Sequence, residues 1–302
     1  MTKAKPGRQP RILARGKPMR ISASVQATYV NGIMRHVDAM IKDVRKQIED
    51  HFRQDFATEH YATDDSVGMD ASLGSQTRIL VNTFKKHYDQ LFGQIAPELS
   101  NEMADKINRN SAQQATASVQ DFPNLKAEGK KLTLDMKYLD KASLNTLNAT
   151  AARSADFIKT IPERYLNTVA EKVYESIVSG NGMQDLIPFF QKHDAGTKNW
   201  VHNTAMDQTR KAFNGLNAGR MKKIGITQGE WIHSGGSQHP RELHQDFDGK
   251  PFDLNKGAPV GDDDGNDVMP GEEPNCRCTF GPVLTADYEP GADTQEDDEE
   301  QE

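Results

Sequence analysis

Five side chains that can bind a transition metal lie near the C-terminal end of the sequence: His233, His239, His244, Cys276 and Cys278. Two thiolates and two imidazoles can form a tetrahedral zinc site, which would stabilise a module with little apolar core. One residue separates the cysteines, a spacing that is poor for a disulfide and usable for a metal. The pattern predicts one structural zinc ion and no other cofactor, with a bend or bulge bringing both sulfurs to the ion. The alternative is that the cysteines pack as small apolar groups and the histidines form ordinary hydrogen bonds.

Catalytic motifs are weaker than this metal pattern. The segment from His239 to His244 lacks the spacing of a metalloprotease helix, so we predict no catalytic residue. The acidic stretch 261–267 offers oxygen ligands that calcium prefers, but it lacks the final glutamate of a calcium loop and is better explained as a solvated turn. The pair Asp248-Gly249 is typical of a tight turn between strands.

The composition excludes several classes of protein. Two cysteines in 302 residues cannot form a disulfide scaffold. No apolar run approaches the roughly 18 residues of a membrane span, and the basic N-terminus lacks the apolar segment of a secretory signal. The mean hydropathy is -0.75. The apolar residues nevertheless recur with a helical period, so we expect a buried core.

Charge is concentrated at the two ends. Residues 1–20 hold seven basic side chains and no acid, and residues 286–302 hold nine acids and no base. Such single-sign segments are usually solvated, so we expect a disordered basic tail over 1–21 and a disordered acidic tail over 286–302. The basic tail is also a candidate DNA-binding arm that neutralises phosphates through Lys3, Lys5, Arg8, Arg11 and Arg15.

Apolar residues at steps of three and four predict a helical body over 22–225. One long amphipathic helix is expected from Val30 to Phe56 and a second from Ile79 to Ile107, with a kink or a helix start at Pro97. The two apolar stripes are expected to pair with each other or with a partner. They comprise Val30, Ile33, Met34, Val37, Met40, Ile41, Val44, Ile48, Phe52 and Phe56, and Ile79, Leu80, Phe84, Tyr88, Leu91, Phe92, Ile95, Leu99, Met103 and Ile107.

Three further helices are expected in the second half of this body. The first begins at the capping box Thr160-Ile161-Pro162-Glu163, buries a stripe that includes Val178, and ends at Gly180. A short helix follows around 186–190. The last opens at Thr197 and ends at Gly225.

Glycine, proline, aspartate and histidine become dense after residue 225, and the long helical patterns stop. Short strands are expected at 229–233, 251–254 and 276–280, the last stopped by Gly281-Pro282, with a long loop over 255–275. The sequence therefore predicts a mainly α protein with long amphipathic helices and a small C-terminal α+β, loop-rich module over 226–285.

Several motifs in this region occur in a fixed order and together resemble a known family. They are Asn214-Gly-Leu-Asn217 and Arg220 at the end of a helix, Trp231, Arg241-Glu-Leu-His244, Phe247-Asp-Gly-Lys-Pro-Phe252, Pro270-Gly271, Asn275-Cys-Arg-Cys278 and Pro282-Val283. Over about residues 197–284 the chain resembles the phage Mu F-like minor head proteins of the phage head morphogenesis family.

This resemblance implies a virion component inside the head, present in the host cytoplasm during assembly. Its expected partners are the portal protein, inner capsid proteins and, weakly and without sequence preference, double-stranded DNA; no membrane and no catalysis are implied. His244, Cys276 and Cys278 match the motif. Trp231, Arg241, Asp248, Gly249 and Arg277 are expected to have structural roles, with Arg241 linking loops rather than pairing locally.

Two other functions remain open at this point. The first is a metal-dependent nuclease or transferase carried on a helical domain. The second is a host-encoded prophage remnant without present activity.

Overall fold

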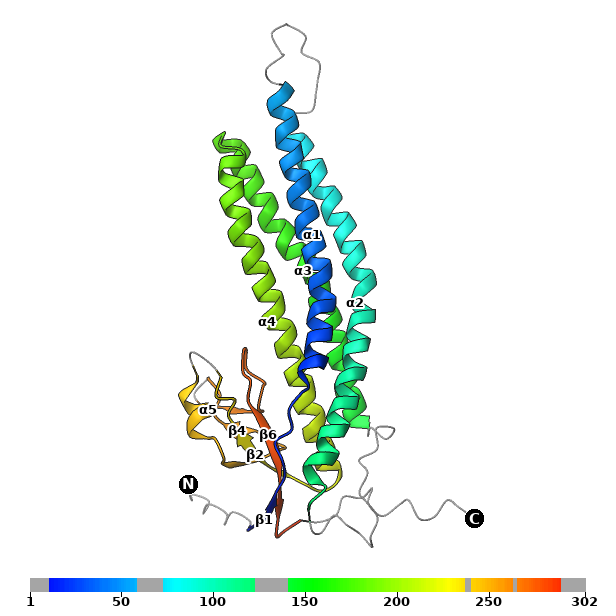
Figure 1. Cartoon of the computed structure of the whole chain (residues 1–302), viewed down its shortest axis with the longest axis vertical. Helices are drawn as coiled ribbons and strands as arrows, with labels where there is room; N and C mark the ends of the chain where they lie inside the picture. Colours follow the sequence, from blue (N-terminus) through cyan, green and yellow to red (C-terminus); the bar gives the residue numbers. More distant parts are fainter. Residues whose placement is uncertain (1–10, 59–72, 123–140, 237–239, 263–264, 289–302) are drawn as a thin grey trace, which may run out of the picture. The chain divides into compact units, whose positions relative to one another are not determined.

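The computed structural model describes residues 11–58, 73–122, 141–236, 240–262 and 265–288. Helices predominate in these ranges, and strands occur near the two ends of the described chain, which confirms the predicted fold class (Figure 1). The helices are α1 (Ala23–Thr58), α2 (Leu73–Val119), α3 (Lys141–Ser179), α4 (Met183–Lys223) and α5 (Glu242–Asp246). Among the described residues, no helix combines the length and apolar character needed to cross a membrane.

The chain forms two compact units. The helical unit comprises Ala27–Glu102 and Ala151–Ala205; the mixed unit comprises Met1–Gln26, Met103–Thr150 and Met206–Glu302. The sequence places a boundary near residue 225, whereas the mixed unit also includes the first residues of the chain and one end of each of the four long helices. Each unit is therefore assembled from segments that are far apart in the sequence.

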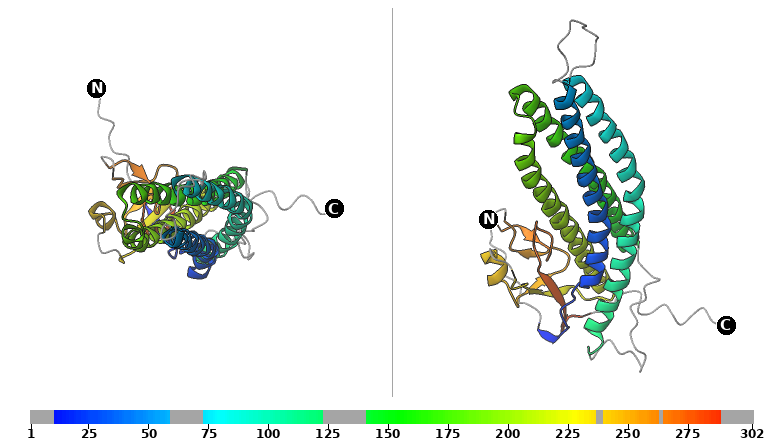
Figure 2. Two further views of the ribbon diagram at one scale, coloured as in Figure 1. Left: turned by 90° about the horizontal axis from the view of Figure 1, so that it is seen from above. Right: turned by 45° about the horizontal axis from the view of Figure 1, so that its top comes forward.

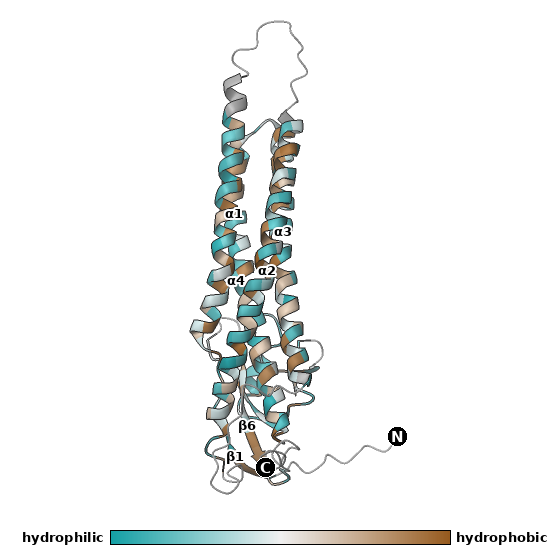
Figure 3. Ribbon diagram, turned by 90° about the vertical axis from the view of Figure 1, so that its right-hand side faces the viewer, coloured by the Kyte–Doolittle hydropathy of each residue, from teal (hydrophilic) through white to brown (hydrophobic). Residues whose placement is uncertain are grey.

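Four helical segments lie side by side in the helical unit (Figure 2). Hydrophilic and hydrophobic residues alternate along each helix with a short period (Figure 3), because apolar residues at steps of three and four occupy one face. On α1 the predicted stripe is buried from Val30 to Phe52, with Met34 half-buried. Phe56 lies outside the residues whose side chains are described.

The predicted α2 stripe is mostly covered as well. Its buried members are Phe84, Tyr88, Phe92, Met103 and Ile107, and its half-buried members are Leu80, Leu91, Ile95 and Leu99. Ile79 is 63% exposed, so its assignment to the stripe is wrong. The helix continues through Pro97 to Val119, which settles the alternative of a helix start there. The two stripes are consequently covered within this chain and are not free for a partner.

The capping box predicted at Thr160 does not start a helix. α3 begins at Lys141 and carries Pro162 in its interior. The Thr160 hydroxyl donates to the carbonyl of Phe157, 2.7 Å away, instead of capping. Burial of Ile158, Ile161 and Tyr165 on both sides of the proline offsets its missing N–H. The predicted end at Gly180, with φ 75°, is confirmed.

Two further predictions about α3 and α4 need correction. Val178 is 89% exposed rather than part of the buried stripe. The two helices expected at 186–190 and from Thr197 are one continuous helix, α4. The reason is that buried Leu186, Phe190, Thr197 and Val201 maintain the helical period across the polar residues between them.

Buried hydroxyl groups add polar contacts inside the helical unit. Ser154 hydrogen-bonds the Tyr29 hydroxyl and accepts from Ser100 at 3.0 Å. Burial raises the pKa of Tyr29 to about 12, although the Ser154 contact lowers it slightly. Every buried hydroxyl in this cluster therefore has a partner, as expected in an apolar interior.

A four-stranded antiparallel sheet organises the mixed unit, with the order β1-β6-β2-β3. The strands are β1 (Ile12–Arg15), β2 (Gln228–Ile232), β3 (Pro251–Asp253) and β6 (Thr279–Thr285). All seven residues of β6 are buried, because it pairs with β1 on one side and β2 on the other. The predicted strands at 229–233 and 251–254 are confirmed within one residue.

The predicted boundaries of the last strand were wrong. β6 starts at Thr279 and runs through Gly281 and Pro282 to Thr285. Proline cannot donate to a neighbouring strand, but its carbonyl accepts the Gly16 N–H at 2.8 Å. Glycine 281 fits because its Cα lies against the main chain of Gly16, where a side chain would clash at 2.8 Å.

The loop predicted over 255–275 contains a second, two-stranded sheet of β4 (Ala258–Pro259) and β5 (Asp267–Val268). Ala258, Val260 and Val268 are buried there. This segment therefore has a small apolar core of its own, which the density of glycine and aspartate obscured.

Part of the expected basic tail belongs to the sheet. β1 pairs with β6 from Ile12 to Arg15, and Met19 is fully buried. The prediction of a disordered tail over 1–21 is wrong for these residues, because their main-chain groups complete the edge of the sheet. At the other end, Tyr288 donates to the carbonyl of Ile224 at 3.0 Å. The rest of the predicted tails, 1–10 and 289–302, lies outside the described residues.

Candidate metal centre

His244 lies on α5, a helix of five residues that follows β2. Its first turn closes with the Gln245 N–H donating to the carbonyl of Arg241 at 3.1 Å. After the helix, a turn at Phe247–Lys250 leads into β3, and Gly249 takes φ 74° there. Only glycine adopts such a φ freely. The predicted turn at Asp248-Gly249 is present, but it joins α5 to β3 rather than two strands.

The two cysteines immediately precede β6, in extended chain that follows a turn. Asn275 takes φ 60° in that turn, and the Cys276 N–H donates to the carbonyl of Glu273 at 3.0 Å. Cys276 and Cys278 are buried, whereas Arg277 between them is exposed. Alternate residues of an extended chain share a face, so both sulfurs lie on the same side. The expectation that a bend or bulge is needed between them was wrong.

α4 holds the cysteine segment through side-chain amide and carboxylate groups. Asn214 donates to the carbonyls of Pro270 and Cys278, at 2.7 and 3.2 Å, and accepts from the Thr279 hydroxyl at 3.2 Å. Two helix turns earlier, Asp207 accepts the Asn275 N–H at 2.8 Å. These bonds satisfy main-chain groups that have no partner on a neighbouring strand, and they fix the position of the cysteines.

The structure brings three of the five predicted ligands together. The Nδ1 atom of His244 lies 3.6 Å from the sulfur of Cys276 and 3.7 Å from that of Cys278. All three ligand atoms lie within 4.8 Å of one another. The side chains are buried, and the Trp231 ring packs edge-on against His244 with centroids 5.0 Å apart.

The two thiols differ in acidity. The thiol of Cys278 hydrogen-bonds the sulfur of Cys276, and this bond lowers the pKa of Cys276 to about 6. The N–H groups of Cys278 and Gly271 also lower this pKa, whereas burial raises it. The same bond, together with burial, raises the pKa of Cys278. Cys276 is therefore the more acidic of the two thiols. A thiolate is both a metal ligand and a nucleophile, but side chains 2–4% exposed are closed to a substrate.

Glu273 is a part of this centre that the sequence analysis missed. Its Oε2 atom lies 2.8 Å from Nε2 of His244, on the ring edge opposite the cysteines. Its other oxygen accepts the Asp262 N–H at 2.6 Å. A carboxylate behind a histidine is a common feature of metal sites. A carboxylate partner for the histidine could therefore be expected from the sequence. However, several acidic residues lie between 262 and 273, and the sequence does not indicate which of them it is.

Residues 167–281 match the family described as Phage Mu protein F like protein. This segment is phage Mu F-like. An uncharacterised protein of Haemophilus influenzae is 25% identical over 272 residues, which cover 89% of this chain and 55% of that protein. The chain thus spans about half the length of this curated relative. No solved structure matches the chain.

The Mu F-like segment contains the whole cluster, and the match confirms the resemblance seen over 197–284. It also extends into α3, a region whose sequence gave no diagnostic motif. The family is associated with phage head morphogenesis and is structural rather than catalytic.

Arg241 links loops within the Mu F-like segment. Its Nε lies 2.8 Å from both carboxylate oxygens of Asp262 and 3.4 Å from Glu273. Its guanidinium also donates to the carbonyl of Pro274 at 3.1 Å. These are the loop contacts expected of this arginine, and Glu242 and Asp248 are not among them.

The remaining predicted ligands do not join the cluster among the described residues. The His233 ring accepts the Gly235 N–H at 3.2 Å, and its own main-chain N–H donates to Asp248 at 2.7 Å. His239 lies outside the described residues. The structure therefore gives His233 and Asp248 a part in the turn geometry of this segment.

The structure describes only two of the five candidate DNA-binding residues. Lys3, Lys5 and Arg8 lie outside the described residues. Arg11 is exposed, and Arg15 on β1 forms an ion pair with Glu230 on β2, with 2.6 Å between Nε and Oε2. Arg15 is thus engaged within the sheet.

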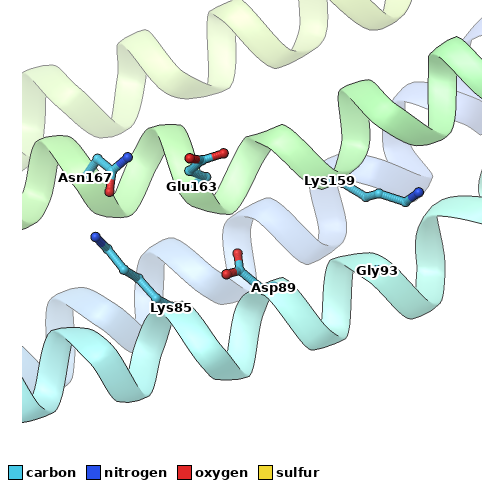
Figure 4. A pocket seen from close by; sticks show the side chains of 6 residues that line it. All are labelled: Lys85, Asp89, Gly93, Lys159, Glu163 and Asn167. Atoms are coloured by element: carbon cyan, nitrogen blue, oxygen red, sulfur yellow. The ribbon is translucent and has the colours of Figure 1, made fainter.

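A surface cavity of about 460 Å³ lies between α2 and α3 in the helical unit (Figure 4). It is lined by Lys85, Asp89, Gly93, Lys159, Glu163 and Asn167. Burial raises the pKa of Asp89, Glu163 raises it further, and Lys85 lowers it. Because acids and bases alternate around this cavity and no set of groups converges, we assign no ligand to it.

Proposed function

We propose that this chain is a minor head protein that acts in phage head morphogenesis, inside the procapsid and in contact with the portal and packaged DNA. The observation that carries the proposal is the match of residues 167–281 to the phage Mu protein F-like family. The buried and substrate-inaccessible cluster favours a structural role over an enzymatic one.

Contacts with other head proteins would use exposed helix surfaces. The apolar stripes of α1 and α2 are covered within the helical unit, so they are not available to the portal or the capsid wall. The exposed faces are rich in charged residues, and binding through them would depend on salt more than apolar docking does.

Head association can be tested by expressing the chain with the portal and capsid genes of the same genome and separating the particles on a gradient. The chain should sediment with procapsids and resist added protease there, as expected for an interior protein. A chain that stays at the top of the gradient beside normally assembled procapsids would contradict the proposal. Cross-linking and mass spectrometry of the particles would then identify the partner.

DNA contact through the basic arm requires a variant that keeps β1. Replacing Lys3, Lys5 and Arg8 by serine removes three charges without touching the paired residues 12–15. Retention on DNA at low salt should fall, and its dependence on salt should become shallower by about three charges. The control replaces the exposed Lys42, Lys46 and Lys192 by serine. Equal retention by both variants would exclude a specific role for the arm.

The alternative of a metal-dependent nuclease or transferase is tested with the same preparation. Cleavage of DNA that requires a divalent metal, is lost in His244→Ala and is kept in the exposed control His202→Ala would favour that enzyme. We expect no turnover in any of the three proteins.

A further inference from the structure

The two sulfurs of the cluster converge on a single ring nitrogen. Nδ1 of His244 lies 3.6 Å from Cys276 and 3.7 Å from Cys278. A ring nitrogen has either one proton or one lone pair in the ring plane, so it can hydrogen-bond well to only one sulfur. Hydrogen bonding alone therefore leaves the second contact unexplained.

A tetrahedral zinc ion accounts for both contacts. Zinc–sulfur bonds of about 2.3 Å and zinc–nitrogen bonds of about 2.0 Å place nitrogen and sulfur about 3.5 Å apart at a tetrahedral angle. The two separations, 3.6 and 3.7 Å, agree with this spacing within about 0.2 Å. All three ligand atoms also lie within 4.8 Å of one another, which is close enough for them to share one ion.

The surroundings orient the ligands in the way that a metal requires. Glu273 lies 2.8 Å from Nε2 of His244, the place where a carboxylate commonly stands behind a metal-binding histidine, and Nδ1 faces the sulfurs. Glu273 is itself held by the Asp262 N–H and faces Arg241 at 3.4 Å. If the two cysteines were packed only as small apolar groups, they would not require a carboxylate held in place behind His244. The arrangement therefore favours a metal site.

We propose that Nδ1 of His244 and the sulfurs of Cys276 and Cys278 bind one Zn²⁺ ion, with Glu273 as the residue that positions His244. Within the described part of the chain, no other histidine, cysteine or acid joins this group, so these residues supply three of the ion's four ligands. The ion would tie α5 to the start of β6 and thereby close a loop of some thirty residues. This inference goes beyond the head-assembly role and does not depend on it.

The first test measures metal in the purified full-length chain after incubation with Zn²⁺ and desalting. We expect about one zinc per chain, and none in Cys276→Ser/Cys278→Ser or His244→Ala. His233→Ala is the matched control and should keep full occupancy, because its ring is not in the cluster. Wild-type chain without zinc, or equal zinc in the double serine variant, would overturn the proposal.

A second measurement does not require the variants to fold. In the wild-type chain, bound zinc should slow alkylation of the two thiols at least tenfold, and a chelator should restore the fast rate. Alkylation that is unchanged by zinc and chelator would exclude the site. Absence of free thiols in the denatured, non-reduced chain would instead show a Cys276–Cys278 disulfide and would also exclude it.

The positioning role of Glu273 has its own readout. Glu273→Gln should weaken zinc affinity about 10–100-fold while keeping the one-to-one stoichiometry. Glu272→Gln, a change of the neighbouring exposed acid, should leave the affinity unchanged. Equal affinities for the two variants would mean that Glu273 does not act on the metal.

Discussion

The helical unit and the Cys-containing part of the mixed unit are stabilised in different ways. In the helical unit, many apolar side chains at steps of three and four are buried, so the stabilisation from apolar burial is spread over many residues. Around the cluster, a few polar side chains, among them Asn214, Arg241 and Glu273, hold several loops each. The comparison teaches that stability is distributed in one region and concentrated in the other, so the two should respond differently to the same kind of substitution.

The largest effect is expected from a charge inside the helical unit. Val44 is fully buried on α1, so Val44→Asp should lower the free energy of unfolding by about 3–5 kcal/mol, the usual cost of an uncompensated buried charge. Urea unfolding followed by circular dichroism measures this loss. Ala39→Asp introduces the same group on the exposed face of the same helix and should change stability by less than about 0.5 kcal/mol. Similar losses in both variants would mean that the stripe is not the buried face.

A smaller but more local effect is expected at Asn214. Asn214→Ala leaves the carbonyls of Pro270 and Cys278 without their donor, which should cost about 1–3 kcal/mol. Hydrogen exchange should show faster opening of residues 270–279 and little change in α1. Asn203→Ala, on the exposed face of α4, serves as the control. Uniform destabilisation of both regions would argue against a concentrated network.

Replacing glycine by alanine should change the stability in opposite directions in the two regions. A methyl group at Gly229 would meet the side chains of Leu254, Phe280 and Phe252 at 2.9–3.1 Å, so Gly229→Ala should destabilise by about 1–2 kcal/mol. At Gly93 on α2 nothing lies within 4 Å, and Gly93→Ala should stabilise by up to about 1 kcal/mol. Melting temperatures measured side by side test the pair. A shift of the same sign at both positions would contradict this contrast in packing.

The smallest effect is a pH dependence in the helical unit. Tyr29 has a pKa of about 12 in the folded chain and an ordinary value of 10.0, because burial opposes its ionisation. Above pH 10 the unfolded chain loses this proton first, so the free energy of unfolding falls as pH rises toward 12, by about 1 kcal/mol at pH 11. Tyr29→Phe should lack this part of the decline, as unfolding curves at pH 8 and 11 would show. Parallel declines in both proteins would mean that Tyr29 does not contribute.

The helices could be predicted because their burial follows a period that is visible in the sequence. Where the prediction failed, as at Thr160 and Thr197, local capping signals were overridden by buried residues on both sides. Local signals describe what a segment prefers alone, whereas a long helix in a bundle gains more from its packed face.

The candidate site was predictable only in part. His244, Cys276 and Cys278 could be proposed from residue type and order, because few residues bind a soft metal. Glu273 and the contacts of Asn214 could not, since they depend on which loops the fold brings together. The same holds for β1, whose partner strand lies more than 260 residues away.

This pairing of β1 with β6 has a consequence for the order of events during synthesis. The ribosome makes residues 12–15 first, but their partner emerges only with residues 279–285. The helical unit is complete at residue 205, so its four segments can pack before β6, the partner strand of β1, has been synthesised. A polypeptide that ends between residues 232 and 279 has β1 and β2 without the strand that lies between them. Such fragments would expose unpaired strand edges, which are prone to non-native pairing, so the complete sheet forms only in chains translated past residue 285.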